Sequence, residues 1–201
     1  MRTMKIYDVE YYRPFHFRIH LKESYLRAES KGAIIFASNG YFAILSEQLD
    51  QLSDKNRLTL LEIERLNQQG IVIGRLHRGW SSHQQQNQTF SRQLIYEEIC
   101  CIQYFLRLIT IHLESRESEG EKLTNHDNVR ILIGKVVQSI EEIEASLESE
   151  ILIKPLKQYI ANVVRTACNH LAKLAGGRSF ISSSVIEMLC TFEVLNKIYL
   201  H

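Results

Sequence analysis

The sequence predicts an all-α helical bundle, and three observations lead to this prediction. The 201 residues include only two prolines and nine glycines, so few positions interrupt long helices. From residue 92 onward, apolar side chains recur at helical spacing in four segments that capping residues or glycines separate. Apolar residues make up 45% of the chain and charged residues 23%, which is ordinary for a globular domain with its own core.

Charge and cysteine content argue against several classes of function. The formal net charge of +1 indicates neither a nucleic acid nor an anionic membrane as partner. Cys100 and Cys101 lie in an apolar run, and the four cysteines show no C-x-x-C spacing, which favours buried thiols in a reducing cytoplasm. The amino terminus lacks the apolar stretch of a signal peptide, and no segment reaches about 18 uninterrupted apolar residues. We therefore expect a cytoplasmic protein.

Residues 1–22 are predicted to form a short extended arm. Aromatic and basic residues alternate in this segment, and Pro14 opposes a helix. The same alternation would suit an arm that stacks on nucleic acid, but the rest of the chain adds no basic patch, which favours packing on the helical body. His16 and His20 would share a metal ion only within a helix, so we predict no metal there.

Residues 23–201 are predicted to form the bundle domain, which begins with two shorter helices. Apolar residues over 30–52 fall on one helical face. A second helix is expected over 54–69, with Gly70 as the glycine that ends it. The polar run 81–89 is typical of a surface loop.

The next helix is predicted to be the central one. Ser91 is a suitable N-cap for a helix over 92–114, whose apolar residues cover most of its circumference. Residues 115–127 are charged and contain Gly120, so we expect a loop.

A one-sided amphipathic helix follows, starting at Asp127 or Asn128. Its apolar residues form a narrow seam, and its glutamates lie outside that seam, as on a solvated face. The seam consists of Val129, Ile133, Val136, Ile140, Ile143, Leu147 and Ile151.

Two more helices complete the predicted bundle. Pro155 suits the first turn of a helix over 156–174, because its missing N–H has no helical partner there. Gly176-Gly177 then ends that helix as a Schellman-like stop. Ser184, with a glutamate three residues later, forms a capping box for a final helix over 185–199.

The carboxy-terminal pattern resembles the end of the acyl-CoA dehydrogenase family. A helix closed by Gly176-Gly177-Arg178 is followed by a linker and a helix ending in Ile198-Tyr199. Family members continue with Glu-Gly, and in many of them that Glu is the catalytic base, whereas this chain has Leu200. The passage 64–74 is similar to part of the family's amino-terminal helical domain, and His112 ends a helix as in the family.

The resemblance implies a fold like the family's helical domains, with FAD as the cofactor and Gly176, Gly177 and Arg178 beside it. In the family a β-domain that supplies much of the flavin site follows the equivalent of helix 92–114, and here only 115–127 stand in its place. We therefore expect that this chain does not hold FAD by itself. Read from the residues alone, Gly176-Gly177 is a helix stop or a close-packing point between helices.

Glu193 is the weak candidate for a replacement base. It lies seven residues before Leu200, on the same helical face but about 10 Å away along the axis. His77 and His83 flank the polar run without a further ligand, so no metal site is predicted. No G-x-S-x-G, G-x-G-x-x-G or P-loop motif is present.

These observations predict a catalytically inert, acyl-CoA dehydrogenase-like subunit with a structural or regulatory role in a homo- or hetero-oligomer. One alternative is a flavin-dependent acyl-CoA or acyl-carrier-protein dehydrogenase, an oxidoreductase that is active only with a partner. The other is an unrelated helical interaction module. The broad apolar surfaces of the last helices predict self-association or a larger protein partner, with no nucleic acid and no membrane.

Overall fold

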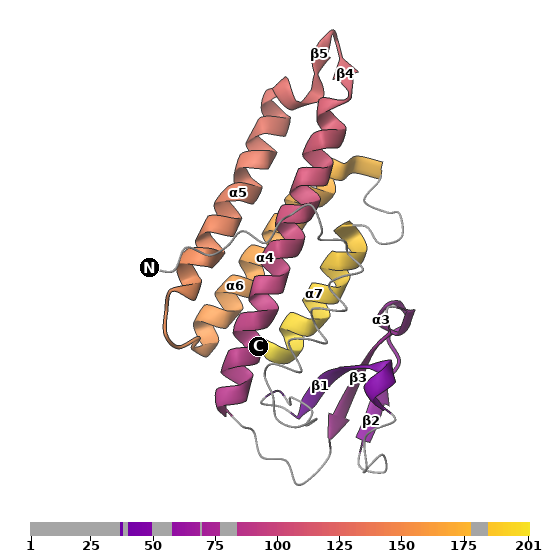
Figure 1. The fold of residues 1–201 in the computed structure, drawn as a ribbon, viewed down its shortest axis with the longest axis vertical. Coiled ribbons are helices and arrows are strands. Elements are labelled where there is room, and N and C mark those ends of the chain that lie inside the picture. The colour runs from indigo at the N-terminus through magenta and orange to yellow at the C-terminus, as the bar shows by residue number, and fades with distance from the viewer. Residues whose placement is uncertain (1–36, 38–39, 50–57, 69, 77–83, 178–184) are drawn as a thin grey trace.

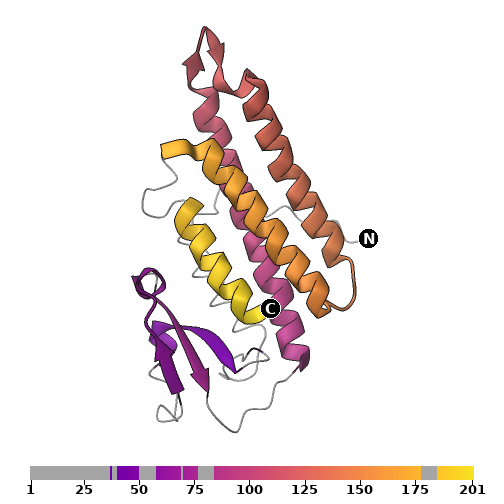
Figure 2. The same cartoon turned by 180° about the vertical axis from the view of Figure 1, so that it is seen from behind.

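The computed structural model describes residues 37, 40–49, 58–68, 70–76, 84–177 and 185–201, and these form a helical bundle beside a small sheet (Figure 1). The predicted arm at 1–22 lies outside the described residues. The sheet and the rest of the bundle lie on opposite sides of the last helix, as both views show (Figure 2). The bundle consists of helices α4 (Gln84–Glu114), α5 (Asp127–Leu147), α6 (Lys154–Ala175) and α7 (Val185–Tyr199). The prediction of a mainly helical chain is confirmed.

A three-stranded sheet corrects the sequence prediction for the region before the bundle. Where a helix was predicted over 30–52, the described residues form strand β1 (Tyr41–Leu45) and a single turn, α2 (Ser46–Leu49). Where a second helix was predicted over 54–69, they form strand β2 (Leu58–Leu61) and α3 (Glu64–Gln68). Both strands pair antiparallel with β3 (Ile71–Leu76), which gives the order β1-β3-β2.

The strands form because short apolar runs find partners across the sheet. β1 and β3 are rich in β-branched and aromatic residues, which pack well on a pleated surface. Gly74 of β3 lies opposite Phe42, and a Cβ at Gly74 would be 2.3 Å from the Phe42 ring, so only glycine fits there. Gly70 has φ 71° and does end a helix, although α3 has only five residues. The passage 64–74 thus runs into a strand of this sheet.

Helix α4 starts earlier than predicted. Residues 84–89 are helical and correct the predicted loop over 81–89, of which 81–83 lie outside the described residues. Gln88 explains the extension, because its side-chain amide donates to the Leu152 carbonyl at 3.0 Å and accepts from the Leu152 N–H at 3.2 Å. Ser91 is therefore inside the helix and is not its N-cap.

The connection between α4 and α5 is a small hairpin where a loop was predicted. Strands β4 (Glu117–Ser118) and β5 (Glu121–Lys122) pair antiparallel and are followed by the 3₁₀ turn η3 (Leu123–Asn125). The two residues between the strands, Glu119 and Gly120, both have positive φ, as a tight hairpin turn requires.

The last three helices agree with the sequence prediction. Helix α5 begins at Asp127, α6 carries its proline in the first turn, and Gly176 follows α6 with φ 56°. Ile151 of the predicted seam is instead 63% exposed, because α5 ends at Leu147. Ser184 of the predicted capping box lies outside the described residues.

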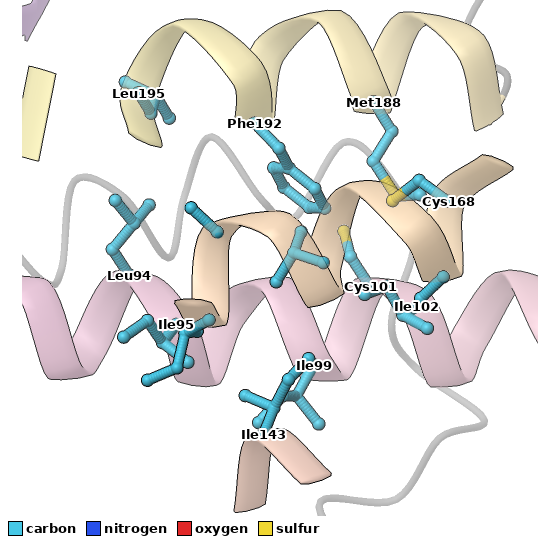
Figure 3. Close-up of a cluster of buried hydrophobic side chains, with 14 of the residues drawn as sticks. Leu94, Ile95, Ile99, Cys101, Ile102, Ile143, Cys168, Met188, Phe192 and Leu195 are labelled. Carbon is cyan, nitrogen blue, oxygen red and sulfur yellow. The ribbon is translucent and has the colours of Figure 1, made fainter. Parts of the chain in front are cut away.

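The main core lies between α4 and the other three helices, each of which α4 contacts (Figure 3). The side chains that meet there are Leu94, Ile95, Ile99, Cys101 and Ile102 of α4, Ile143 of α5, Cys168 of α6, and Met188, Phe192 and Leu195 of α7. No disulfide forms among the four cysteines, all of which lie in the described residues, and burial raises the pKa of the half-buried Cys100 to about 11. In the part of the chain that the structure describes, no helix combines the length and apolarity that a membrane span needs.

Candidate functional site

The end of α7 contains the position at which the family resemblance places a catalytic base. Here α7 meets the sheet and the start of α4. The Ala43 N–H of β1 donates to the Tyr199 hydroxyl oxygen at 2.9 Å, and the ring of Tyr199 packs edge-on against Phe90 of α4 with centroids 4.6 Å apart. The Ile-Tyr ending therefore fastens α7 to the sheet.

Leu200 is enclosed at this junction. Its side chain is 1% exposed, and its backbone N–H donates to the Asn196 carbonyl at 2.9 Å. An alkyl side chain cannot accept a proton, and a buried one does not face a substrate. The position after Tyr199 therefore contributes packing.

A buried polar chain supports the same junction. Lys157 of α6 donates to Ser91 Oγ at 2.8 Å, and the Ser91 hydroxyl donates to the Tyr199 carbonyl at 3.3 Å. Burial lowers the pKa of Lys157, and a serine beside such a lysine is a nucleophile arrangement in some enzymes. Ser91 is fully buried, however, so no acyl group reaches its hydroxyl. The hydrogen bond from Ser91 instead satisfies the Tyr199 carbonyl at the end of α7.

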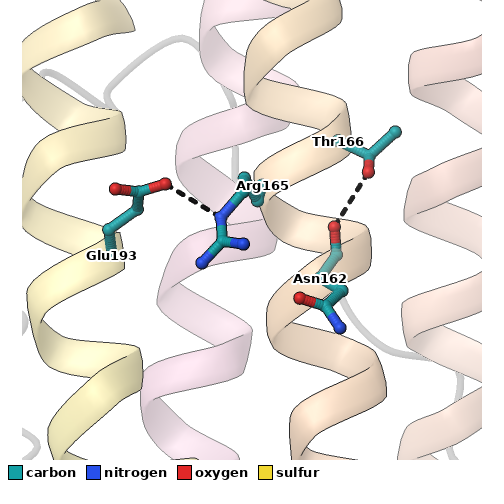
Figure 4. Close-up of polar contacts among 4 residues, drawn as sticks. All are labelled: Asn162, Arg165, Thr166 and Glu193. Carbon is teal, nitrogen blue, oxygen red and sulfur yellow. Dashed lines mark hydrogen bonds and ion pairs between the residues drawn. The ribbon is translucent and has the colours of Figure 1, made fainter.

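Glu193, the candidate base, is held in an ion pair between α7 and α6 (Figure 4). Its Oε1 lies 2.8 Å from Nε of Arg165, and both side chains are partly exposed. Close by on α6, the Thr166 hydroxyl donates to the Asn162 carbonyl at 2.9 Å. Glu193 thus faces a guanidinium on α6, while Leu200 is buried at the junction.

The glycines predicted to approach a flavin form an open turn. The Gly176 N–H donates to the Ala172 carbonyl and closes α6, which confirms the helix-stop interpretation. Among the described residues, a Cβ built on Gly176 or Gly177 would meet nothing within 4 Å, so neither is a close-packing point between the described helices. Arg178 lies outside the described residues, and contact of this turn with a flavin stays a prediction.

Sequence reasoning missed a buried carboxyl group in the core. Glu98 of α4 is fully buried, and neither of its carboxylate oxygens has a hydrogen-bond partner among the described residues. Asn196 of α7 is also buried, with its Oδ1 similarly unsatisfied. Burial raises the pKa of Glu98 well above its usual range, and the Asn196 side chain lowers it to a smaller extent.

A sequence signal for Glu98 did exist. Glu98 lies four residues after Leu94 and four before Ile102, both of which are buried, so helical spacing alone places it on the core face of α4. The acid is enclosed, which makes it a feature of the core and not a group presented to a substrate.

Histidine and cysteine positions do not converge on a metal. In the described ranges, no three potential ligand residues lie together. His112 is half-buried near the end of α4, and its carbonyl accepts a hydrogen bond from Ser115 Oγ at 2.7 Å. His16, His20, His77 and His83 lie outside the described residues.

Two solved structures resemble this fold. FkbI, for biosynthesis of the methoxymalonyl extender unit of the Fk520 polyketide immunosuppressant, is 12% identical with a TM-score of 0.53, over 71% of this chain and 46% of that one. The prolyl acyl carrier protein oxidase AnaB is 13% identical with a TM-score of 0.55, over 80% of this chain and 53% of that one. No protein-family model and no curated protein matches the sequence.

Similarity at this level of identity shows the fold alone. The fold is an acyl-CoA dehydrogenase-like one, in agreement with the resemblance of the carboxy-terminal residues. The chain spans about half the length of each of the two structures.

Proposed function

We propose that this protein is a catalytically inert, acyl-CoA dehydrogenase-like subunit with a structural or regulatory role in an oligomer. The observation that carries the proposal is Leu200, an apolar and buried side chain at the position where the resemblance places a base. Tyr199 beside it binds the sheet, so this end of α7 serves the architecture.

The chemistry of the family requires groups that the described residues do not present. Removal of a proton next to a thioester needs a carboxylate within about 3 Å of that proton, and the reaction also needs a hydride acceptor. Glu193 faces Arg165, and Glu98 is enclosed in the core. The proposed function uses no flavin, and contact of a flavin with the Gly176-Gly177 turn stays a prediction.

The subunit role is supported by apolar side chains on the surface. They occur on β2, α4, α5, α6 and the α5–α6 connection, and apolar side chains of this size at the surface lose contact with water when a protein covers them. The exposed large apolar residues are Leu60, Leu61, Leu108, Ile111, Ile131, Val137, Ile151, Ile153 and Tyr159.

An electron-acceptor dye assay tests the proposal. The purified protein is assayed with acyl-CoAs of several chain lengths, with and without added FAD, and we expect no turnover. Glu193→Gln is the informative variant, because it removes the candidate base while keeping its shape. Wild-type turnover that this variant abolishes would refute catalytic inertness.

A second candidate is a flavin-dependent dehydrogenase or oxidase that is active only with a partner. Its support is the similarity to AnaB, described as an acyl carrier protein oxidase, over 80% of this chain. The protein is purified with its natural partners, which mass spectrometry identifies, and the visible spectrum of the complex is recorded. A flavin band together with turnover in the complex, absent from the isolated chain, would favour this candidate.

A further inference from the structure

Unpaired polar atoms are buried where α7 packs against α4. Glu98 of α4 is fully buried, and neither of its carboxylate oxygens has a hydrogen-bond partner among the described residues. Asn196 of α7 is buried beside it, and within the same ranges its Oδ1 is also unsatisfied. Folded proteins leave few buried polar atoms unpaired, so a group of them at one contact between helices requires an explanation.

The ionisable groups around Glu98 do not compensate a negative charge on it. On α6 the buried Cys168 thiol lies near Glu98, and Cys101 of α4 and Glu193 of α7 lie near that thiol. These groups are neutral or negative. Arg165 of α6 is a cation in this neighbourhood, but it is paired with Glu193 at 2.8 Å. A carboxylate at Glu98 would therefore depend on the amide of Asn196 and on water.

Helix α5 also brings a negative group to this part of α4. Its Glu144 lies near Cys100, where it acts together with Glu97 to raise the pKa of that thiol. Glu97 itself accepts a hydrogen bond from the Gln93 side chain at 2.9 Å, one turn earlier on α4. The acidic groups next to Glu98 in the sequence and across on α5 thus add no positive charge to the site.

Movement of α7 would bring water to Glu98 while the other helices stay packed. Helix α7 lies on the side of the bundle away from α5 (Figures 1 and 2) and packs against α4, α6 and β1. Helices α4, α5 and α6 all contact one another without it. Asn196 would leave together with α7, and its backbone carbonyl would still accept from the Leu200 N–H at 2.9 Å.

We propose that the protonation state of Glu98 controls the packing of α7: the helix stays on the bundle while Glu98 carries a proton, and loss of that proton lets it separate from α4 and α6. A neutral acid is tolerated in a core that also holds Cys168 and Phe192 (Figure 3), whereas a carboxylate needs donors or water. Tyr199 can hold α7 to β1 in both forms, since its hydroxyl bonds to the sheet. The inference does not depend on the proposed lack of catalysis.

The direction of the pH effect follows from proton linkage. Burial raises the pKa of Glu98 in the packed form, the Asn196 side chain lowers it to a smaller extent, and separation of α7 returns the carboxyl to the usual value of 4.5. The packed form therefore binds the proton more tightly than the separated form. From about pH 4.5 up to the pKa of the packed form, each pH unit should favour separation roughly tenfold for one proton.

Hydrogen exchange followed by mass spectrometry tests the proposal. Protection factors of the α7 amides are measured over about pH 5–8, with the effect of pH on the intrinsic exchange rate divided out. We expect the most protected amides of α7 to lose protection as the pH rises. They should also stay less protected than the most protected amides of α5, because α5 keeps its packing when α7 separates.

Two glutamate-to-glutamine variants identify the group that titrates. Glu98→Gln keeps the shape of the side chain and removes its proton equilibrium, so its α7 protection factors should not depend on pH. Glu141→Gln makes the same substitution on the exposed face of α5 and should keep the wild-type profile, with circular dichroism to verify folding.

Three results would each overturn the proposal. They are wild-type α7 protection that does not change with pH, an equal change in Glu98→Gln, and α7 amides as protected as those of α5 at every pH. The wild-type profile decides the question by itself if Glu98→Gln does not fold.

Discussion

At the scale of single residues, Glu98 shows how position in the fold changes the chemistry of a side chain. A glutamate on an exposed face of α5 is solvated, whereas Glu98 is enclosed in the core, with the amide of Asn196 and the Cys168 thiol near it. Burial disfavours the charged carboxylate in such surroundings and favours the protonated acid, which raises the pKa of Glu98. As an acid it has a proton to donate, and Asn196 Oδ1 is an unsatisfied acceptor in the same core.

Glu98 is expected to make the folded state less stable as the pH rises. Its folded pKa lies above the usual value of 4.5, so the folded state binds the proton more tightly than the unfolded state. Stability from this group is complete below about pH 4.5 and is lost as the pH rises toward the folded pKa. Glu98→Gln keeps the shape of the side chain and removes its titration. The free energy of unfolding of the variant, relative to that of wild type, should therefore increase as the pH rises. Urea unfolding at a series of pH values measures this, and parallel profiles for the two proteins would contradict it.

The Tyr199 hydroxyl is expected to contribute to stability through its contact with β1. Tyr199→Phe removes the acceptor of the buried Ala43 N–H, which should cost about 1–3 kcal/mol in the free energy of unfolding. Tyr159→Phe is the matched control, since the Tyr159 hydroxyl only donates to Glu142 at 3.3 Å on the surface. Chemical denaturation gives the free energy of unfolding of both variants. Equal losses of stability would argue against a stabilising contact between the Tyr199 hydroxyl and β1.

At the scale of elements, the helices differ in what sets their ends. Helix α6 ends at a glycine with positive φ, which is a local signal. The start of α4 depends instead on Gln88 and its two hydrogen bonds to Leu152, 64 residues away. The same connection also receives Arg92, which donates to the Leu147 carbonyl at 2.9 Å and to the Ser149 carbonyl.

Two glycine-to-alanine substitutions are expected to change stability in opposite directions. Gly134 lies inside α5 with open space around its Cβ position, so Gly134→Ala should stabilise by about 0.5–1 kcal/mol. Gly176 has φ 56°, which strains any residue with a Cβ, so Gly176→Ala should destabilise by roughly 1 kcal/mol or more. Thermal unfolding followed by circular dichroism measures both. A stabilised Gly176→Ala variant would show that the turn relaxes freely.

At the scale of the whole molecule, the bundle buries one side of α4 and leaves a surface groove between α4 and α5 open. The core lies between α4 and its three neighbours, while Ile111 and Val137 face solvent together at the groove.

The proposed role as a subunit of an oligomer predicts that the thermal midpoint rises with protein concentration. Association that occurs only between folded chains stabilises the folded state by mass action. Differential scanning calorimetry at several concentrations provides the measurement. A midpoint of wild type that does not depend on concentration would contradict the prediction.

The sequence by itself determined the existence of the last three helices, the start of α5 at Asp127 and the glycine stop after α6, but not the end of α5 at Leu147. Their signals are apolar spacing, a proline in a first turn and a glycine after a last one, all of which act within a few residues. The Ile-Tyr ending also pointed to the fold that the two solved structures share.

Only the tertiary structure decided the rest. Strands β1 and β2 form because β3 pairs with both, so an apolar run that suits either structure becomes a strand through residues elsewhere in the chain. Ser91, Lys157 and Tyr199 join across three helices, and Glu98 meets Asn196 almost a hundred residues later. Local spacing shows which face of a helix is buried, but the group that lies opposite a side chain follows from how the helices pack.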